Sequence, residues 1–109
     1  MTDKIVVLST CANPVDAERV ARALVEARLA ACVNVVPGLR SYYRWQGALE
    51  SSEEVLLLIK SSRELFDELK LAIEKLHPYE VPEVVALPIV AGSENYLEWM
   101  GAGLRGVSD

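Results

Sequence analysis

Two segments of this sequence carry side chains that could hold a metal ion. Cys32 offers a thiolate, which is a soft ligand suited to copper or zinc. The segment 77–83 brings an imidazole (His77), a phenol (Tyr79) and a carboxylate (Glu83) into one loop, which two prolines stiffen. Thiol, imidazole and carboxylate in one short chain lead us to expect a site for copper or another divalent metal ion at Cys32, His77 and Glu83.

Each of these features also has a purely structural explanation. Cys32 follows Ala30 and Ala31, and such a cysteine can simply be a small apolar residue buried in the core. The segment 77–83, with its two prolines, can be a rigid connection that carries a solvated histidine. Cys11, in the loop expected before the first helix, could bind a metal as Cys32 could. A lone loop thiol is weak support for a site.

Lys60, Tyr79 and Trp45 could instead contact a small molecule. Lys60 precedes two serines at a predicted helix start, where backbone N–H groups and a cation could hold an anion, although an ordinary capped helix explains the same residues. Trp45 follows Tyr42 and Tyr43 and could offer a stacking surface. Aromatic side chains at the end of a long hairpin more often pack on a neighbouring subunit, so we interpret them first as an interface.

Composition excludes several classes of function. The formal net charge is -5, and Lys and Arg are spread thinly, so a nucleic-acid-binding surface is not expected. There is no glycine-rich phosphate loop, no CxxC pair and no HExxH motif, and the sequence has one histidine. We therefore expect a binding protein and not an enzyme, although His77, Tyr79 and Glu83 could move protons in a cleft.

The elements that must position these side chains follow from the apolar pattern. Strands are expected where β-branched and aromatic residues gather, and helices where apolar residues recur every three or four positions. The first half is predicted to contain a strand over 4–9, a helix from Pro14 capped by Asn13, and a strand over 33–45 with a bulge or bend at Pro37-Gly38. A turn at Gln46-Gly47, a strand ending in 55–59 and a helix with a capping box at Ser61 and Glu64 follow. The chain then continues with a strand over 84–90, which Pro88 places at an edge or a bulge, and a helix over 93–100.

This order predicts a single α+β domain over residues 1–109 with a ferredoxin-like β-α-β-β-α-β plan and a short C-terminal helix. Both helices of that plan cover one face of the sheet. The continuous apolar run 55–59 indicates that both faces of its strand are covered. One helix layer cannot do this alone, so the chain is expected to associate with copies of itself.

The apolar run that follows Lys4 is too short for a signal peptide core or a membrane span. A cytoplasmic location without membrane insertion is therefore expected. In that reducing compartment Cys11 and Cys32 should remain free thiols.

Several motifs taken together are more specific than any one of them: Leu29 to Asn34, Pro37-Gly38, Ser41 to Tyr43, Trp45 to Gly47, Lys60, His77 to Tyr79, Val81 to Glu83, and Tyr96-Leu97 with Trp99. In this combination the chain resembles the CutA divalent-cation-tolerance family over nearly its whole length. The resemblance implies a homotrimer with clefts between neighbouring subunits, a role in tolerance of divalent metals, copper especially, and a PII-like shape suggestive of signalling.

The resemblance also implies roles for particular residues. Cys32 matches the thiol associated with copper in the family, and Lys60, His77, Tyr79 and Glu83 match polar residues of the intersubunit cleft. Some members have further thiols at positions that hold Ser9 and Ala72 in this chain, and Cys11 is an extra thiol offset from that pattern. An alternative function is a regulatory scaffold that binds a small anionic ligand or a protein partner in the cleft.

Overall fold

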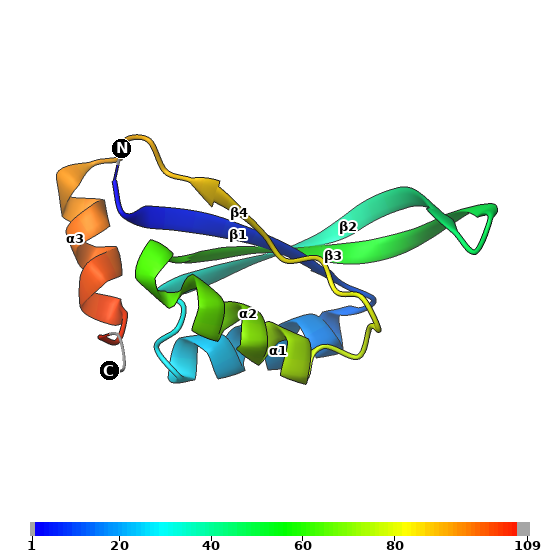
Figure 1. Ribbon diagram of the computed structural model, residues 1–109, viewed down its shortest axis with the longest axis horizontal. Coiled ribbons are helices and arrows are strands. Elements are labelled where there is room, and N and C mark those ends of the chain that lie inside the picture. The colour runs from blue at the N-terminus through cyan, green and yellow to red at the C-terminus, as the bar shows by residue number, and fades with distance from the viewer. Residues whose placement is uncertain (1, 107–109) are drawn as a thin grey trace.

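The computed structural model describes residues 2–106 as a sheet with two helices packed on one face and a third at one end (Figure 1). The elements in chain order are β1 (Lys4–Cys11), α1 (Pro14–Glu26), β2 (Cys32–Trp45), β3 (Ala48–Ser62), a 3-10 turn η1 (Arg63–Leu65), α2 (Phe66–Leu76), β4 (Val85–Pro88) and α3 (Glu94–Gly103). This order confirms the predicted ferredoxin-like α+β plan with an added C-terminal helix.

The sheet is antiparallel with the strand order β2-β3-β1-β4, so β2 and β4 are its edges. Pro88 lies on the edge strand β4, as predicted, because a proline there removes no N–H that a central strand needs. β2 and β3 continue beyond the end of β1 as a two-stranded arm that closes at Gln46-Gly47 (Figure 1). The arm is the long hairpin that the sequence predicted.

The pairing of β2 with β3 shifts between Val36 and Leu39, which confirms the bulge predicted at Pro37-Gly38. Gly38 has φ +83, a left-handed conformation that side chains rarely adopt. Proline and glycine fit this position because proline lacks an N–H for the ladder and glycine tolerates the positive φ.

The core lies between the sheet and the layer of α1 and α2. Asn13 begins α1, because its side-chain oxygen accepts a hydrogen bond from the Asp16 N–H at 2.9 Å. Apolar residues at helical spacing on α1 and α2 then meet every second residue of β1 and β3. The fully buried members of this cluster include Val7, Val20, Leu24, Leu57, Ile59, Leu69 and Ile73.

The capping box predicted at Ser61 and Glu64 is wrong. β3 runs through Ser62, because Ser61 still pairs with Ile5 of β1 in an extended conformation. The Ser61 hydroxyl donates to the Leu29 carbonyl oxygen at 2.7 Å and is not available to a helix N-terminus. The second helix therefore begins later than predicted, at Phe66.

Two strand boundaries also differ from the prediction. β1 extends two residues past Ser9, because Thr10 and Cys11 still pair with β3. β4 covers Val85–Pro88 and not 84–90, because its partner residues on β1 end at Ile5 and Leu8. The extension of β1 places Cys11 in the sheet and not in the loop where it was expected.

The second face of the sheet is only partly covered within one protomer. Directly opposed residues of an antiparallel pair share a face, so the row Cys32, Lys60, Val6 and Leu87 crosses the sheet on the side away from α1 and α2. α3 packs at one end of this face, and Leu87 is 47% exposed. One helix layer therefore leaves part of the second face bare within the protomer, as the ferredoxin-like plan predicted.

Candidate functional site

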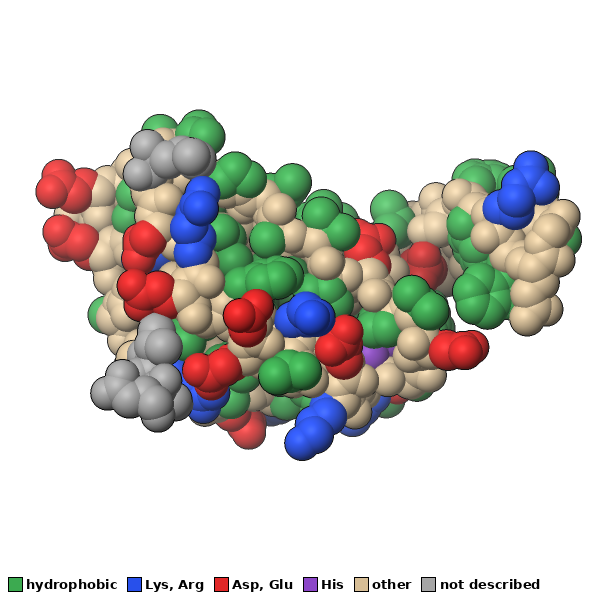
Figure 2. Space-filling view, in the orientation of Figure 1, with side chains coloured by type: hydrophobic (Ala, Val, Ile, Leu, Met, Phe, Trp, Pro, Cys, Tyr) green, Lys and Arg blue, Asp and Glu red, His purple; other side chains and the backbone are tan. Residues whose placement is uncertain are grey.

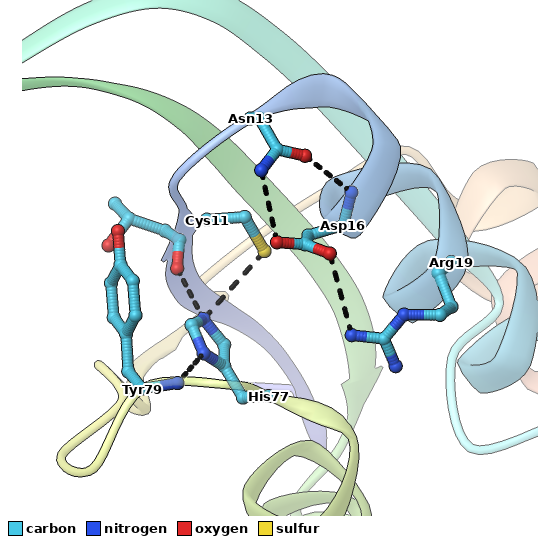
Figure 3. A network of polar contacts seen from close by, with 7 residues as sticks. Cys11, Asn13, Asp16, Arg19, His77 and Tyr79 are labelled. Carbon is cyan, nitrogen blue, oxygen red and sulfur yellow. Dashed lines mark hydrogen bonds and ion pairs between the residues drawn. The ribbon is translucent and has the colours of Figure 1, made fainter.

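A thiol and an imidazole meet where β1 and α2 end. Cys11 is the last residue of β1 and faces the helix layer, and His77 directly follows α2. The Cys11 Sγ atom lies 3.7 Å from the His77 Nε2 atom, and both residues are buried (Figure 3). The structure therefore joins a soft and a borderline metal ligand from segments that are distant in sequence.

The surrounding backbone determines which nitrogen of His77 carries the proton. The Tyr79 N–H donates to Nδ1 at 3.1 Å, so Nδ1 is the acceptor. Nε2 then carries the hydrogen of the neutral ring and donates to the Thr10 carbonyl oxygen at 2.5 Å. These two bonds fix the ring plane and point Nε2 toward β1 and the Cys11 thiol.

Burial raises the pKa of the Cys11 thiol above its ordinary value, and the Asp16 carboxylate raises it further. Asp16 is held near β1 by Asn13, which donates from Nδ2 to its Oδ2 at 3.1 Å (Figure 3). Arg19 lies 3.8 Å from the other Asp16 oxygen and acts in the opposite direction on the thiol. Because burial and the acidic neighbour outweigh the arginine, Cys11 is a neutral thiol near pH 7 in the absence of a metal ion.

A cavity of about 600 Å³ opens beside this pair, between the arm and the loop that follows α2. It is lined by Thr10, Ser41, Tyr42, Tyr43, Trp45, Glu54, Tyr79, Glu80, Val81 and Glu83. In Figure 2 it appears as the hollow between the tip of the arm and the body of the molecule, with acidic side chains at its foot. We call it the arm cavity.

The half-buried Tyr79 and the buried Glu54 form one wall of the arm cavity. The Tyr79 hydroxyl donates to Oε2 of Glu54 at 2.8 Å, and Glu54 is only 9% exposed. Burial raises the pKa of Tyr79 well above its ordinary value, and the hydrogen bond to the Glu54 carboxylate adds to the shift. The Tyr79 ring also packs on the His77 ring with a centroid separation of 4.5 Å, so the cavity wall and the thiol–imidazole pair are in direct contact.

The six residues predicted to bind ligands fall into two groups. Trp45, Tyr79 and Glu83 line the arm cavity, and His77 packs against Tyr79. Cys32 and Lys60 lie opposite each other in neighbouring strands at the other end of the sheet.

Lys60 and Cys32 belong to the end of the sheet that α3 covers. The Lys60 Nζ atom donates to the Tyr96 hydroxyl at 3.3 Å and lies 5.6 Å from the centre of that ring. Lys60 pairs with Cys32, and Leu56 pairs with Thr10, whose carbonyl oxygen contacts His77. The four positions from Leu56 to Lys60 along β3 correspond to about 13 Å at the usual rise of a strand. One protomer therefore does not bring Cys32 to His77.

Among residues 2–106, no three or more His, Cys, Asp or Glu side chains lie close enough to share a metal ion. The site contains Glu54, which the sequence did not single out, and Cys11, which the sequence offered only as a weakly supported ligand in a loop. Cys11 could have been found by continuing the alternation of Val7 and Ser9 by one more step on the core face. Glu54 had no such indication, because its burial depends on the loop that returns from α2 to Tyr79.

No helix in the described part of the chain is both long enough and apolar enough to span a membrane. The fold and the site define the class of protein. It is a ferredoxin-like α+β protein in which a buried thiol–imidazole pair lies beside an acidic, aromatic cavity. Residues 5–103 match the family model described as CutA1 divalent ion tolerance protein, so the chain belongs to this family.

Individual relatives agree with this assignment. The chain is 54% identical over 95 residues to the divalent-cation tolerance protein CutA of Thermus thermophilus, covering 87% of this chain and 92% of that protein. It is 43% identical over 105 residues to the protein of the same name from Pectobacterium atrosepticum, covering 96% of each. A solved structure of the Thermus thermophilus divalent cation tolerance protein superposes with a TM-score of 0.91 at 50% identity, covering 94% of this chain and 99% of that one.

Proposed function

We propose that the protein contributes to divalent-metal tolerance by binding a thiophilic transition-metal ion, copper in the first place, and that it does so as a homotrimer in the cytoplasm without catalysing a reaction. The observation that carries this proposal is the 3.7 Å separation of Cys11 Sγ and His77 Nε2. Thiolate and imidazole are the ligand types that copper and zinc prefer in proteins.

The separation suits two ligands of one metal ion. A thiolate at about 2.3 Å and an imidazole at about 2.0 Å from a tetrahedral ion lie about 3.5 Å apart, so Cys11 and His77 need to move only slightly to share an ion. Two protein ligands also suit cuprous copper, which accepts a low coordination number and favours thiolate. The side chains fit such an ion without rearrangement of the sheet.

Binding requires changes in protonation at both residues. The Cys11 thiol loses its proton, and the hydrogen on His77 Nε2 has to leave the Thr10 carbonyl oxygen. After metal binding the imidazole carries its hydrogen on Nδ1. In the present structure Nδ1 accepts a hydrogen bond from the Tyr79 N–H, so the backbone at Tyr79 has to shift. Metal affinity should therefore rise with pH, and metal binding should shift the loop that lines the arm cavity.

Assembly would add the remaining predicted ligands. Cys32 can join His77 only from another copy of the chain, because it lies at the far end of the sheet in its own protomer. The partly covered face supplies an apolar surface for such contacts, with Val36, Val85, Leu87 and Trp99 all more than 40% exposed. The free edges of β2 and β4 could add hydrogen bonds between protomers.

Competition titration of the reduced protein with Cu(I) in the absence of oxygen tests the metal site, with Zn(II) as a divalent comparison. We expect Cys11→Ser and His77→Gln each to lower the affinity by more than about tenfold, and Cys32→Ser to have a smaller effect. Unchanged affinity in both of the first two variants would contradict the proposal. Loss of binding in Cys32→Ser alone would place the anchor thiol at Cys32 and not at Cys11.

Light scattering tests the assembly. The expected particle contains three chains of 12.0 kDa each, and it should persist when Cys11→Ser removes metal binding. A well-folded monomer at micromolar concentration would show that the exposed sheet face does not drive association.

A role in binding a small anion receives less support from the site. The described lining of the arm cavity contains three carboxylates, Glu54, Glu80 and Glu83, and no Lys or Arg. Lys60, the cation predicted for an anion, is held by Tyr96 at the other end of the sheet. An anionic ligand or a PII-like signalling role would therefore need a cleft that two subunits build together.

A further inference from the structure

The arm cavity has a chemistry that metal binding at Cys11 and His77 does not use. Its volume of about 600 Å³ lies within the usual range for small-molecule sites, about 300 to 1,000 Å³. Its walls come from two segments: the β2–β3 arm and the loop that His77 and Tyr79 anchor to β1 and β3. Such a cavity can bind a molecule much larger than a metal ion.

The charge of the cavity lining is negative. Glu54 is only 9% exposed. Within residues 2–106 the Glu54 carboxylate accepts its hydrogen bond from the Tyr79 hydroxyl. No ion pair joins Glu54 to a basic side chain in this part of the chain. A buried carboxylate without a cation is costly, and Glu80 and Glu83 add further negative charge at the cavity rim. The cavity is therefore complementary to a positively charged group.

The opposite wall is aromatic. Tyr43 and Trp45 share the face of the arm that carries Glu54 and are 42% and 45% exposed. Tyr42 alternates to the other face of β2. Aromatic faces attract organic cations through the ring quadrupole and also cover the apolar part of such a molecule. A hydrated inorganic ion would use the carboxylates but not these rings.

The hydrogen bond between Tyr79 and Glu54 selects among organic cations. Because the Tyr79 hydroxyl donates its hydrogen to Glu54, the free lone pairs of the phenol oxygen and of the carboxylate can only accept hydrogen bonds. We propose that the arm cavity binds a primary organic ammonium, with the NH3+ group at Glu54 and Tyr79 and the carbon chain against Trp45. This inference goes beyond the proposed metal site and does not depend on it.

Calorimetric titration of the assembled protein with 1,4-diaminobutane and with 2-phenylethylammonium tests the site. We expect saturable binding of both amines, and much weaker binding of tetramethylammonium, which has no N–H to donate, and of butyrate, which has the opposite charge. No saturable amine binding up to about 10 mM would overturn the proposal, and so would preferred binding of butyrate. A neighbouring subunit that fills the cavity would give the same negative result and overturn it equally.

Two variants and a matched control locate the binding. Glu54→Gln should weaken amine binding by at least about tenfold, because the buried charge is lost. Glu53→Gln removes the same charge from the next residue, whose side chain is 79% exposed and lies outside the lining, and should leave binding unchanged. Trp45→Ala on the exposed arm gives a second test if Glu54→Gln does not fold. Equal affinities in Glu53→Gln, Trp45→Ala and the parent protein would overturn the assignment.

Cys11→Ser separates this inference from the proposed metal function. The variant should lose copper affinity and keep amine binding, because Cys11 is not part of the cavity lining. Loss of amine binding in Cys11→Ser with an unchanged fold would show that the two sites are one, and the inference of a separate amine site would be wrong.

Discussion

The Cys11 thiol and the His77 imidazole lie 3.7 Å apart although 66 positions separate them in the sequence. Cys11 is 0% exposed, and the same burial raises its pKa, so the thiol is both inaccessible and poorly ionised and should react slowly. In a Cys32→Ser variant, where Cys11 is the remaining thiol, we expect labelling by a bimane reagent to be about a hundredfold slower in the native protein than in urea. Fast native labelling would show that the thiol is open to solvent, and a Cys11→Ser variant provides the background rate.

Tyr79 should give the protein a specific response to alkali. Because its folded-state pKa is raised above the ordinary value of about 10, the folded protein keeps this proton when the unfolded chain would lose it. The contribution to stability is fully present below pH 10 and falls as the pH rises from there toward the folded pKa.

The measurement is the absorbance of tyrosinate near 295 nm during an alkaline titration of the native protein. One of the four tyrosines should fail to ionise until the protein unfolds, and Tyr79→Phe should remove this delayed step. Tyr42→Phe is the control, because Tyr42 is 70% exposed and takes no part in the hydrogen bond to Glu54, so the delayed step should remain. Ionisation of all four tyrosines together in the folded protein would contradict the expectation.

Two buried serines should respond to substitution in opposite ways. Ser61 donates a hydrogen bond to the Leu29 carbonyl oxygen, whereas the fully buried Ser9 hydroxyl has no partner in the described part of the chain. Ser61→Ala should lower the free energy of unfolding by about 1 to 3 kcal/mol, because a buried carbonyl loses its donor. Ser9→Ala should change it by less than about 0.5 kcal/mol or raise it, because an unpaired polar group is removed.

Urea unfolding at one fixed protein concentration compares the two variants, since oligomer stability depends on concentration. A large loss of stability in Ser9→Ala would show that its hydroxyl has a partner, such as a bound water molecule.

Leu57 tests the position of the core. It is fully buried at the centre of β3, so Leu57→Ala should lower the free energy of unfolding by about 2 to 5 kcal/mol. Leu71 on α2 is 61% exposed, and Leu71→Ala should change it by less than about 0.5 kcal/mol. Similar losses in both variants would indicate that Leu71 is buried by another subunit.

Much of the fold could be predicted from local patterns. The β-branched apolar run of β1, the apolar spacing on α1 and the Asn13 cap depend on neighbours within a few positions, and the structure confirms each of them. The bulge at Pro37-Gly38 and the edge position of Pro88 were also predictable, because proline and glycine restrict the backbone wherever they occur. The capping box at Ser61 failed because pairing with β1 held that residue in the strand.

The sequence by itself determined which elements form, and the motifs that match the CutA1 family run along the same chain. Only the tertiary structure decided which chemical groups meet. The register of β1 on β3 brings Cys11 to His77 and leaves Cys32 at the opposite end of the sheet. The physical reason is that strand pairing and helix packing join residues far apart in sequence, and their spacing along the chain does not encode that contact.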